Sequence, residues 1–303
     1  MNRPDEKTPK ESPGKLRSRR AVASVLVAAL AVASCAQRRS ASAPSSDAEP
    51  PARTQRERAS PVVGPDLKTR GSERRDATGS DANGLVTLPV PGFEAAFVSF
   101  PATPRFSAPV LVAAHGAGDT PEALCETFRR LLGDRGVVLC PSGPRMFAHS
   151  EGRYFPNHPA LERIVLASLD ALAAAYPRGI DVTNVAYAGY SQGATMGALM
   201  LVAHGDRFPR LLLIEGGGKD WTLARARQFR TGGGRQVLFV CGTTSCRTHA
   251  KGSASLLDAA GVATSVVSDI RAGHTYEGPV LALLENNLNA FLSDDPRWSS
   301  PDR

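Results

Sequence analysis

The chain has 303 residues, 42% of them hydrophobic, and a formal net charge of +7 at pH 7. Residues 1–80 carry 16 Lys/Arg and 9 Asp/Glu, so the totals of 36 and 29 leave 20 of each for residues 81–303. The basic excess therefore belongs to the first 80 residues. The remainder has no basic stripe interleaved with aromatic side chains, which argues against nucleic acid as a partner.

The N-terminal region has the anatomy of an export signal. A basic segment ending at Arg20 precedes an apolar run over 21–33, which is shorter than the roughly 20 residues of a membrane-spanning helix. The tetrapeptide "VASC" resembles a bacterial lipobox, which implies cleavage before Cys35 and lipidation of that cysteine. We expect a signal peptide over 1–34 and a membrane-anchored lipoprotein, periplasmic or on the cell surface. Plain secretion is the alternative.

Residues 35–84 are rich in Ala, Ser, Pro and Arg and hold almost no large apolar side chains, so we expect a disordered linker there. Four cysteines follow it, an even number in a chain expected in an oxidising compartment. We favour disulfides Cys125–Cys140 and Cys241–Cys246, because each pair closes a short segment. The other connectivities, and free thiols, remain open.

From residue 85 onward, apolar runs alternate with segments of helical character. Most of the runs are continuously apolar, as in parallel strands buried on both faces. We therefore predict an α/β domain over 85–295, built on a mostly parallel, doubly wound sheet of about eight strands, and a tail over 296–303. The predicted strands are 85–90, 94–100, 109–116, 136–143, 185–191, 210–216, 236–242 and 264–270, and the predicted helices are 122–132, 160–175, 192–204, 221–229, 253–260 and 276–291.

Ligands of open α/β sheets bind at the carboxyl ends of the strands, so the residues after each run matter most. The third run ends in "HGAGD" (115–119), where we expect His115 to orient the loop. The fourth leads into the long loop 141–159, whose Phe147, Tyr154 and Phe155 either line an acyl or aromatic pocket or form a local packing cluster.

The fifth run ends in "GYSQG", in which a strand turns sharply into a helix. Gly189 and Gly193 remove side chains that would collide across the turn, and Ser191 is held at its tip. A serine hydroxyl needs a base to become a nucleophile, and an imidazole suits that task. His274, in the "RAGHTYEG" loop after the eighth run, is the best placed. The motifs predict Ser191 as nucleophile and His274 as base.

Residues 86–293 resemble the α/β-hydrolase superfamily in "GYSQG", "HG" and "GH". The pattern is similar to phospholipase/carboxylesterase-like, dienelactone-hydrolase-like and polyester-depolymerase-like esterases. The dienelactone hydrolases themselves use cysteine where this chain has Ser191. The resemblance implies an oxyanion hole of two backbone N–H groups, one from Gln192 and one from Ala117, with Gly116 as the alternative.

The chain departs from these families in the position of the acid of the expected triad. They usually carry an aspartate after the seventh strand, and here that position falls in "CGTTSCRTHA", with Ser245 in its place. Some members place the acid after the sixth strand, which here precedes Glu215 and Asp220. We choose Glu215, which stands at the strand's end, and keep Asp220 as the alternative.

The resemblance implies a serine esterase without a cofactor. We expect it to act on short- or medium-chain or aromatic esters, as small molecules or polymer ends, and to be a monomer. The connection after the sixth run is too short for a large cap domain. We expect no metal site, because "CGTTSC" lacks the second half of a zinc site. The alternative is a non-catalytic surface lipoprotein that uses the fold as a binding module, an idea supported by the missing aspartate.

Overall fold

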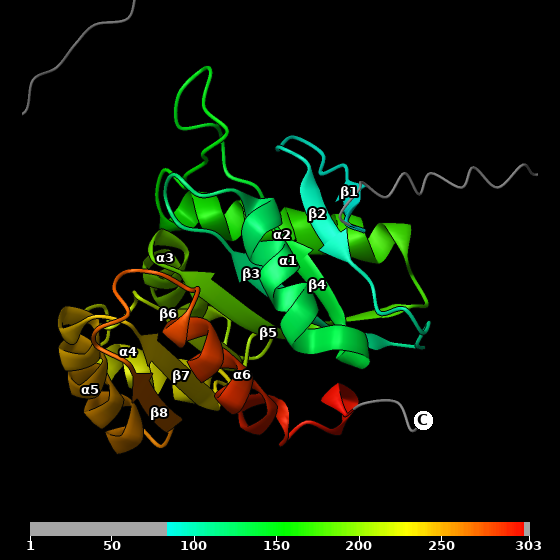
Figure 1. Cartoon of the computed structure of the whole chain (residues 1–303). Coiled ribbons are helices and arrows are strands. Elements are labelled where there is room, and N and C mark those ends of the chain that lie inside the picture. Colours follow the sequence, from blue (N-terminus) through cyan, green and yellow to red (C-terminus); the bar gives the residue numbers. More distant parts are fainter. Residues whose placement is uncertain (1–83, 300–303) are drawn as a thin grey trace, which may run out of the picture. The chain divides into compact units, whose positions relative to one another are not determined.

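The computed structural model describes residues 84–299. The predicted signal peptide, Cys35 and almost all of the predicted linker lie outside the described residues. Within the described part of the chain, three successive strands are followed by six α-helices that alternate with five more strands (Figure 1). The strands are β1 Val86–Leu88, β2 Ala96–Ser99, β3 Ala108–Ala114, β4 Val137–Cys140, β5 Ile180–Tyr190, β6 Arg210–Ile214, β7 Gln236–Cys241 and β8 Ala263–Ser268. The α-helices are α1 Pro121–Leu132, α2 His158–Ala175, α3 Gln192–Met200, α4 Leu223–Thr231, α5 Thr244–Ala259 and α6 Pro279–Leu292.

The strands form one sheet in the order β1-β2-β4-β3-β5-β6-β7-β8. β2 pairs antiparallel with both β1 and β4, and every other neighbouring pair is parallel. The predicted doubly wound, mostly parallel sheet of eight strands is confirmed. Its parallel strands carry their carboxyl ends at one edge, where the sequence analysis placed the site.

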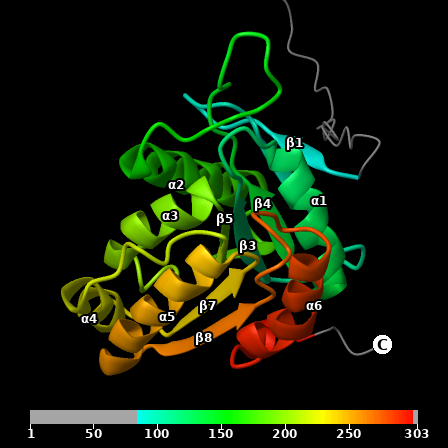
Figure 2. The ribbon, with the colours of Figure 1, turned by 60° about the vertical axis from the view of Figure 1, so that its left-hand side comes forward.

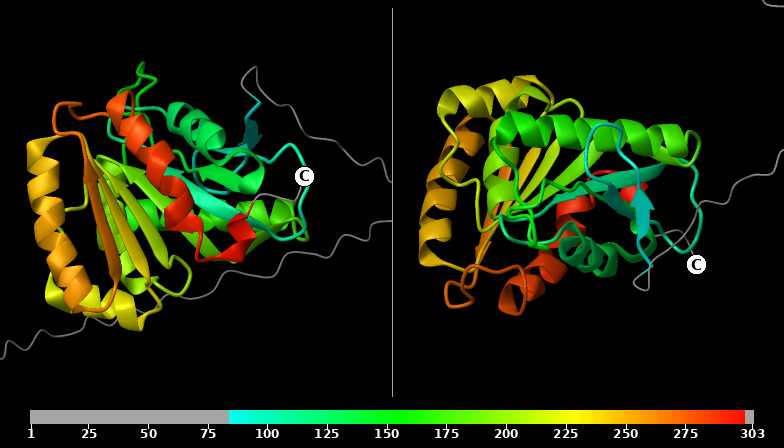
Figure 3. Two further views of the ribbon diagram at one scale, coloured as in Figure 1. Left: turned by 60° about the horizontal axis from the view of Figure 1, so that its bottom comes forward. Right: turned by 90° about the horizontal axis from the view of Figure 1, so that it is seen from above.

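Helices cover both faces of the sheet (Figures 2 and 3). Successive residues of β3 belong alternately to two buried clusters, Val110 and Val112 to one and Leu111 and Ala113 to the other. This period of two is what a strand buried on both faces requires. The first cluster receives side chains of α2, α3, α4 and α5, and the second receives those of α1 and α6. No helix among residues 84–299 is long and apolar enough to cross a membrane.

The predicted helix 253–260 is too short, because α5 begins at Thr244, directly after β7. The Thr243 side chain accepts a hydrogen bond from Cys246 N and so caps the helix. A capping threonine satisfies one of the free N–H groups of a first helical turn. The segment "CGTTSC" is therefore a strand end and a capped helix start, where the sequence analysis expected a loop.

Both predicted cysteine pairs lie at disulfide distance, with S–S separations of 2.18 Å for Cys125–Cys140 and 1.97 Å for Cys241–Cys246. The first joins α1 to the end of β4. The second joins the end of β7 to the first turn of α5. Each disulfide thus fixes a helix to the strand beside it at the edge where the site is expected.

The folded part continues past residue 295, which the sequence analysis took as its end. Residues 296–298 form a short 3-10 helix, and Trp298 is buried in the cluster under α1 and α6. An ion-pair network precedes it, in which the buried Arg210 of β6 pairs with Asp294 and Asp295. Asp295 also accepts hydrogen bonds from Arg297. The prediction of a tail is wrong over residues 296–298. A single tryptophan, Trp298, packs this segment onto the core, and one buried residue gives no periodic pattern in the sequence.

We expect Asp295→Asn to lower the free energy of unfolding by about 1–3 kcal/mol at pH 7, because Arg210 and Arg297 lose a charged partner. Burial alone would raise the pKa of Asp295, but the hydrogen bonds of Arg297 and the charges of Arg297 and Arg210 outweigh it and lower the pKa. A carboxylate with a lowered folded-state pKa stabilises the protein above its unfolded pKa of about 4 and loses that effect at lower pH. The difference between the two proteins in urea unfolding is therefore expected to shrink below about pH 4. The exposed Asp258→Asn is the control, and a pH-independent difference for Asp295→Asn would contradict the assignment.

Candidate active site

Ser191 occupies a strained turn between β5 and α3. Its backbone has φ 49° and ψ −105°, a combination that non-glycine residues rarely adopt. The turn is possible because the residues two positions before and after Ser191 are glycines. A Cβ on Gly189 would lie 2.6 Å from Ala194 N, and one on Gly193 would lie 2.2 Å from the carbonyl oxygen of Ala114. The turn places Ser191 at the amino end of α3, where the helix dipole favours negative charge.

The structure brings Ser191, His274 and Glu215 into one hydrogen-bonded chain. His274 Nε2 lies 2.8 Å from Ser191 Oγ, and His274 Nδ1 lies 3.0 Å from Glu215 Oε2. The three residues follow β5, β6 and β8, so the arrangement sits at the carboxyl edge of the sheet. The Glu215 side chain is 1% exposed and that of His274 is 53% exposed. A buried carboxylate thus orients an imidazole that remains open to solvent and to a ligand.

Glu215 is held by the backbone that follows β7. Its Oε1 accepts hydrogen bonds from Gly242 N and, at 2.9 Å, from Thr243 N. Its Oε2 accepts one from Thr243 Oγ1 at 3.0 Å and faces His274 Nδ1. Glu215 also has a positive φ of 51°, so both it and Ser191 are held in backbone conformations that cost energy. This complete set of donors compensates the burial of the carboxylate.

Asp220, the alternative acid, occupies a different place. Within the described residues its side chain forms no hydrogen bond with His274, and its backbone carbonyl accepts one from Arg225. Burial raises the pKa of Asp220, against the charges of Arg225 and Lys219. Of the two acids, the structure brings Glu215 to the histidine.

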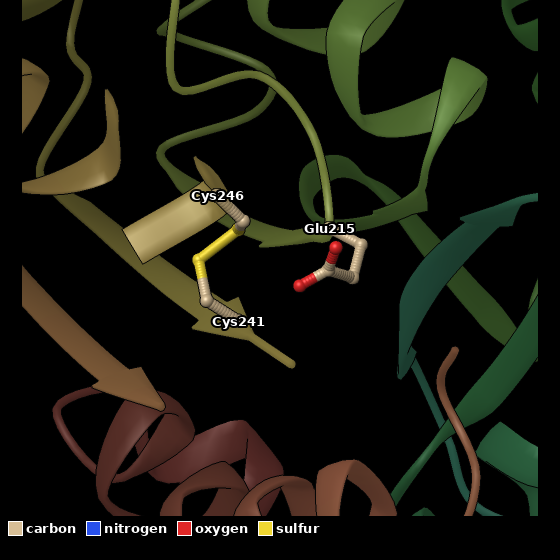
Figure 4. Close-up of side chains that lie close together, drawn as sticks. All are labelled: Glu215, Cys241 and Cys246. Carbon is tan, nitrogen blue, oxygen red and sulfur yellow. A yellow bond between two sulfur atoms is a disulfide. The ribbon is translucent and has the colours of Figure 1, made fainter. Parts of the chain in front are cut away.

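The disulfide Cys241–Cys246 lies beside the Glu215 carboxylate (Figure 4). Donor atoms of these three residues lie within 4.8 Å of one another, a spacing that could hold a metal ion. Here the two sulfur atoms are bonded to each other and the carboxylate oxygens already accept hydrogen bonds from Gly242 and Thr243. A metal site needs thiolates and a free carboxylate, so this donor set in its disulfide form does not fit one. The disulfide instead braces the two N–H groups that hold Glu215.

The predicted oxyanion loop 115–119 lies against Ser191. A Cβ on Gly116 would lie 2.9 Å from Tyr190 Cδ1 and 3.3 Å from Ser191 Cβ, so a side chain there would crowd both residues. The N–H groups of Gly118 and Asp119 already donate to Arg153 O and Gly116 O. This leaves Ala117 and Gly116 as the candidate donors of the loop, as predicted. The other candidate, the N–H of Gln192, is the first of helix α3 and has no partner carbonyl in that helix.

His115 orients this loop, as the sequence analysis expected. It is fully buried, and burial lowers its pKa to about 4, so the imidazole is neutral. Nε2 accepts a hydrogen bond from Gly143 N at 3.2 Å, which leaves the proton on Nδ1, 2.8 Å from Gly116 O. The ring stacks on Phe155 at a centroid distance of 4.3 Å. His115 thus ties the 115–119 loop to the long loop after β4.

Tyr190 links the remaining parts of the site. Its hydroxyl donates to His274 O at 2.9 Å, and its ring lies 5.4 Å from the imidazole. The same ring fills the space that a Cβ on Gly116 would need. Burial, followed by the negative charges of Asp119, Glu215 and Glu277, raises the pKa of Tyr190 to about 12, so the donor proton is retained. The residue before Ser191 therefore positions both the histidine loop and the oxyanion loop.

The comparisons with known proteins support the fold. No protein-family model matches the chain, and no curated protein matches it in sequence. Among solved structures, it is similar to a dienelactone hydrolase from Anabaena variabilis, with a TM-score of 0.52 and 13% identity over 69% of this chain and 96% of that one. It is also similar to Est1E from Butyrivibrio proteoclasticus, with a TM-score of 0.51 and 15% identity over 70% of this chain and 98% of that one.

The chain has the α/β-hydrolase fold. In this fold, lids commonly follow the sixth strand, but here only residues 215–222 separate β6 from α4. Within residues 84–299 there is no large cap, as the sequence predicts, and the His274 side chain is 53% exposed.

Sequence reasoning missed two features of the site. The N–H groups of Gly242 and Thr243 cannot be recognised in the sequence, since any residue except proline supplies an N–H. The hydroxyl of Tyr190 belongs to the motif, but the sequence does not show its partner.

The three aromatic residues of the long loop lie in different environments. Phe155 is fully buried in the core, Tyr154 is partly buried and Phe147 is exposed. For Phe155, which stacks on His115, local packing is the correct alternative.

We expect Cys241→Ser with Cys246→Ser to slow covalent labelling of Ser191 by a fluorophosphonate about tenfold or more, because the backbone that holds Glu215 loses its brace. The matched control is Cys125→Ser with Cys140→Ser. Its longer loop predicts a loss of about 3 kcal/mol in unfolding free energy, against about 2 kcal/mol for the shorter loop. We expect the control to label at a rate within about twofold of wild type. Labelling rates that fall in both double variants in proportion to their loss of unfolding free energy would contradict the role of the Cys241–Cys246 pair.

Proposed function

We propose that this protein is a serine hydrolase that cleaves carboxylic esters through an acyl-enzyme. The observation that carries the proposal is the unbroken hydrogen-bonded chain from Glu215 through His274 to Ser191 at the tip of a strained turn. The Glu215 carboxylate is buried and all its hydrogen-bond partners are present, the imidazole lies between it and the serine, and the serine lies beside a glycine-containing loop. Chance contacts at a protein surface do not produce this arrangement. This constellation is what nucleophilic acyl transfer needs.

In the proposed reaction, Ser191 Oγ attacks the ester carbonyl carbon and His274 Nε2 takes the hydroxyl proton. Glu215 holds the Nδ1 proton of His274 and stabilises the imidazolium that forms. The N–H groups of Gln192 and Ala117, with Gly116 as the alternative, stabilise the developing oxyanion. The tetrahedral intermediate then collapses, and His274 returns the proton to the leaving alkoxide oxygen. Water, activated by the same base, releases the acid and restores Ser191. None of these steps requires a cofactor.

The open site suits small soluble esters of short or medium chain length, or the exposed ends of polymers, better than lipid chains that need a covered tunnel. The second candidate, a non-catalytic binding module, drew its support from the absence of an acid after β7. That support weakens because Glu215, after β6, meets His274 at 3.0 Å. We further propose that the protein acts as a monomer and binds no nucleic acid.

We expect Ser191→Ala and His274→Ala to lower kcat/KM for p-nitrophenyl acetate and butyrate by about 10⁴-fold or more, since each removes a group that moves in the reaction. Glu215→Gln keeps the shape but removes the charge behind the imidazole, and we expect a loss of about 10²- to 10⁴-fold. Asp220→Asn is the matched carboxylate variant, expected to lose less than tenfold. Steady-state kinetics measure all four. An inactive wild type that no fluorophosphonate labels, or a larger loss for Asp220→Asn than for Glu215→Gln, would contradict the proposal.

We also propose that the protein is exported and anchored through a lipid on Cys35, with secretion as the alternative. The proposal rests on the lipobox-like "VASC" after an apolar run. We expect the full chain to incorporate labelled palmitate and to fractionate with membranes, and Cys35→Ala to do neither. Cys125→Ala, which leaves the lipobox intact, is the control. Membrane association of Cys35→Ala equal to that of wild type would show that another segment provides the anchor.

A further inference from the structure

A cavity of about 320 Å³ opens beside the histidine, between the β6–α4 connection and the first turns of α5. Both His274 and Glu215 line it, so it belongs to the same edge of the sheet as Ser191. Its size lies at the lower end of the roughly 300–1,000 Å³ of small-molecule sites. It can therefore hold one ring or a short branched group.

The lining is unusual for a site of this size, because no Val, Leu, Ile, Met, Phe, Tyr or Trp takes part in it. Ligand pockets are generally lined by apolar and aromatic side chains. Here the walls are the glycines 216–218, the half-cystine Cys246 and a set of polar side chains. The polar side chains, besides the two of the triad, are Thr195, Lys219, Asp220, Thr243, Ser245 and His249.

The cavity presents charges of both signs. Within residues 84–299, the side chains of Lys219 and Asp220 form no hydrogen bond or ion pair, although the Lys219 charge acts on the neighbouring Asp220 carboxylate. An anionic ligand would meet Asp220 and Glu215, and a cationic one would meet Lys219. A neutral hydroxyl group can accept a hydrogen bond from an ammonium and donate one to a carboxylate at the same time. Several hydroxyl groups on one carbon skeleton match this arrangement best.

The position of the cavity identifies the part of the substrate that it would hold. His274 lines it, whereas neither Ser191 nor the candidate oxyanion donors of Gln192 and the 115–119 loop do. In acyl transfer, the imidazole returns its proton to the leaving oxygen, so the leaving group lies against the histidine. The carbonyl oxygen points to the oxyanion donors instead. The cavity therefore lies on the alcohol side of the ester.

We propose that this cavity binds the polyhydroxylated alcohol of the ester, a sugar ring or a similar polyol, with Lys219 and Asp220 as the residues that select it. The inference rests on the proposed function and narrows its substrate class from alkyl esters to esters of polyols. It also assigns Asp220 a part in recognition, after the structure separated it from His274.

The test uses two acetates with six-carbon alcohols, glucose 6-acetate and hexyl acetate, whose acyl groups are identical. We expect the wild-type kcat/KM to be at least tenfold higher for glucose 6-acetate. Lys219→Met and Asp220→Asn should each reduce that ratio about tenfold, the scale of one charge-assisted hydrogen bond. The matched control is Lys251→Met, an exposed lysine of α5 that does not line the cavity, for which the ratio should stay unchanged. Faster hydrolysis of hexyl acetate, or an unchanged ratio in both cavity variants, overturns the inference.

A binding measurement separates this inference from the proposed function. Methyl β-glucoside is titrated into Ser191→Ala, with and without Lys219→Met, and the side-chain resonances of His249 and His274 are followed by NMR. We expect saturable shifts that weaken about tenfold with Lys219→Met. Saturable, Lys219-dependent binding in a protein whose wild type hydrolyses no ester would remove the esterase proposal and retain the polyol site. Ester hydrolysis without glucoside binding would do the reverse.

Discussion

The site depends on how the Glu215 carboxylate is held. It is buried, and a buried charge is tolerated only when its oxygens are fully paired. Two backbone N–H groups, one hydroxyl and the imidazole of His274 supply these partners. Three of the four come from Gly242 and Thr243, at the point where β7 ends and α5 begins. The geometry of that junction therefore controls the orientation of the histidine. The capping of α5 by Thr243 and the disulfide from Cys241 to Cys246 both stabilise the junction.

Backbone strain at the site is offset by packing around it. Ser191 and Glu215 both have positive φ, and glycines two residues from Ser191 and directly after Glu215 let neighbouring chain segments approach closely. A Cβ on Gly216 would lie 2.4 Å from the carbonyl oxygen of Ser191, so the acid and serine turns fit only as a pair. Tyr190 then connects this pair to His274 and to the 115–119 loop. Strain of this kind persists only where the surroundings determine the conformation, and here three loops and one tyrosine provide the constraint.

The sheet, the order of strands and helices along the chain, and Ser191 and His274 could be predicted because each has a local signature. Continuous apolar runs mark the buried strands, and "GYSQG" and "RAGHTYEG" follow two of them. The choice of Glu215 over Asp220 rests on its place at the strand's end, with glycines after it, and the structure brings Glu215 to His274. The start of α5 and the burial of Trp298 were missed because they depend on a capping hydroxyl and on a tertiary contact. Such interactions join residues that no periodic pattern connects.

The position of the acid also explains why a polar cavity exists beside the histidine. The esterases that the sequence resembles usually carry an aspartate after the seventh strand, where this chain has Ser245. Because Glu215 supplies the carboxylate from β6, the segment after β7 is free to form the first turn of α5, with Ser245 and His249 facing the cavity. The short β6–α4 connection contributes Lys219 and Asp220 to the opposite wall. With the carboxylate one strand earlier, neither a lid nor an acid-bearing loop fills the space beside His274. The hydrogen-bonding groups that line this space therefore remain available to a hydroxylated ligand.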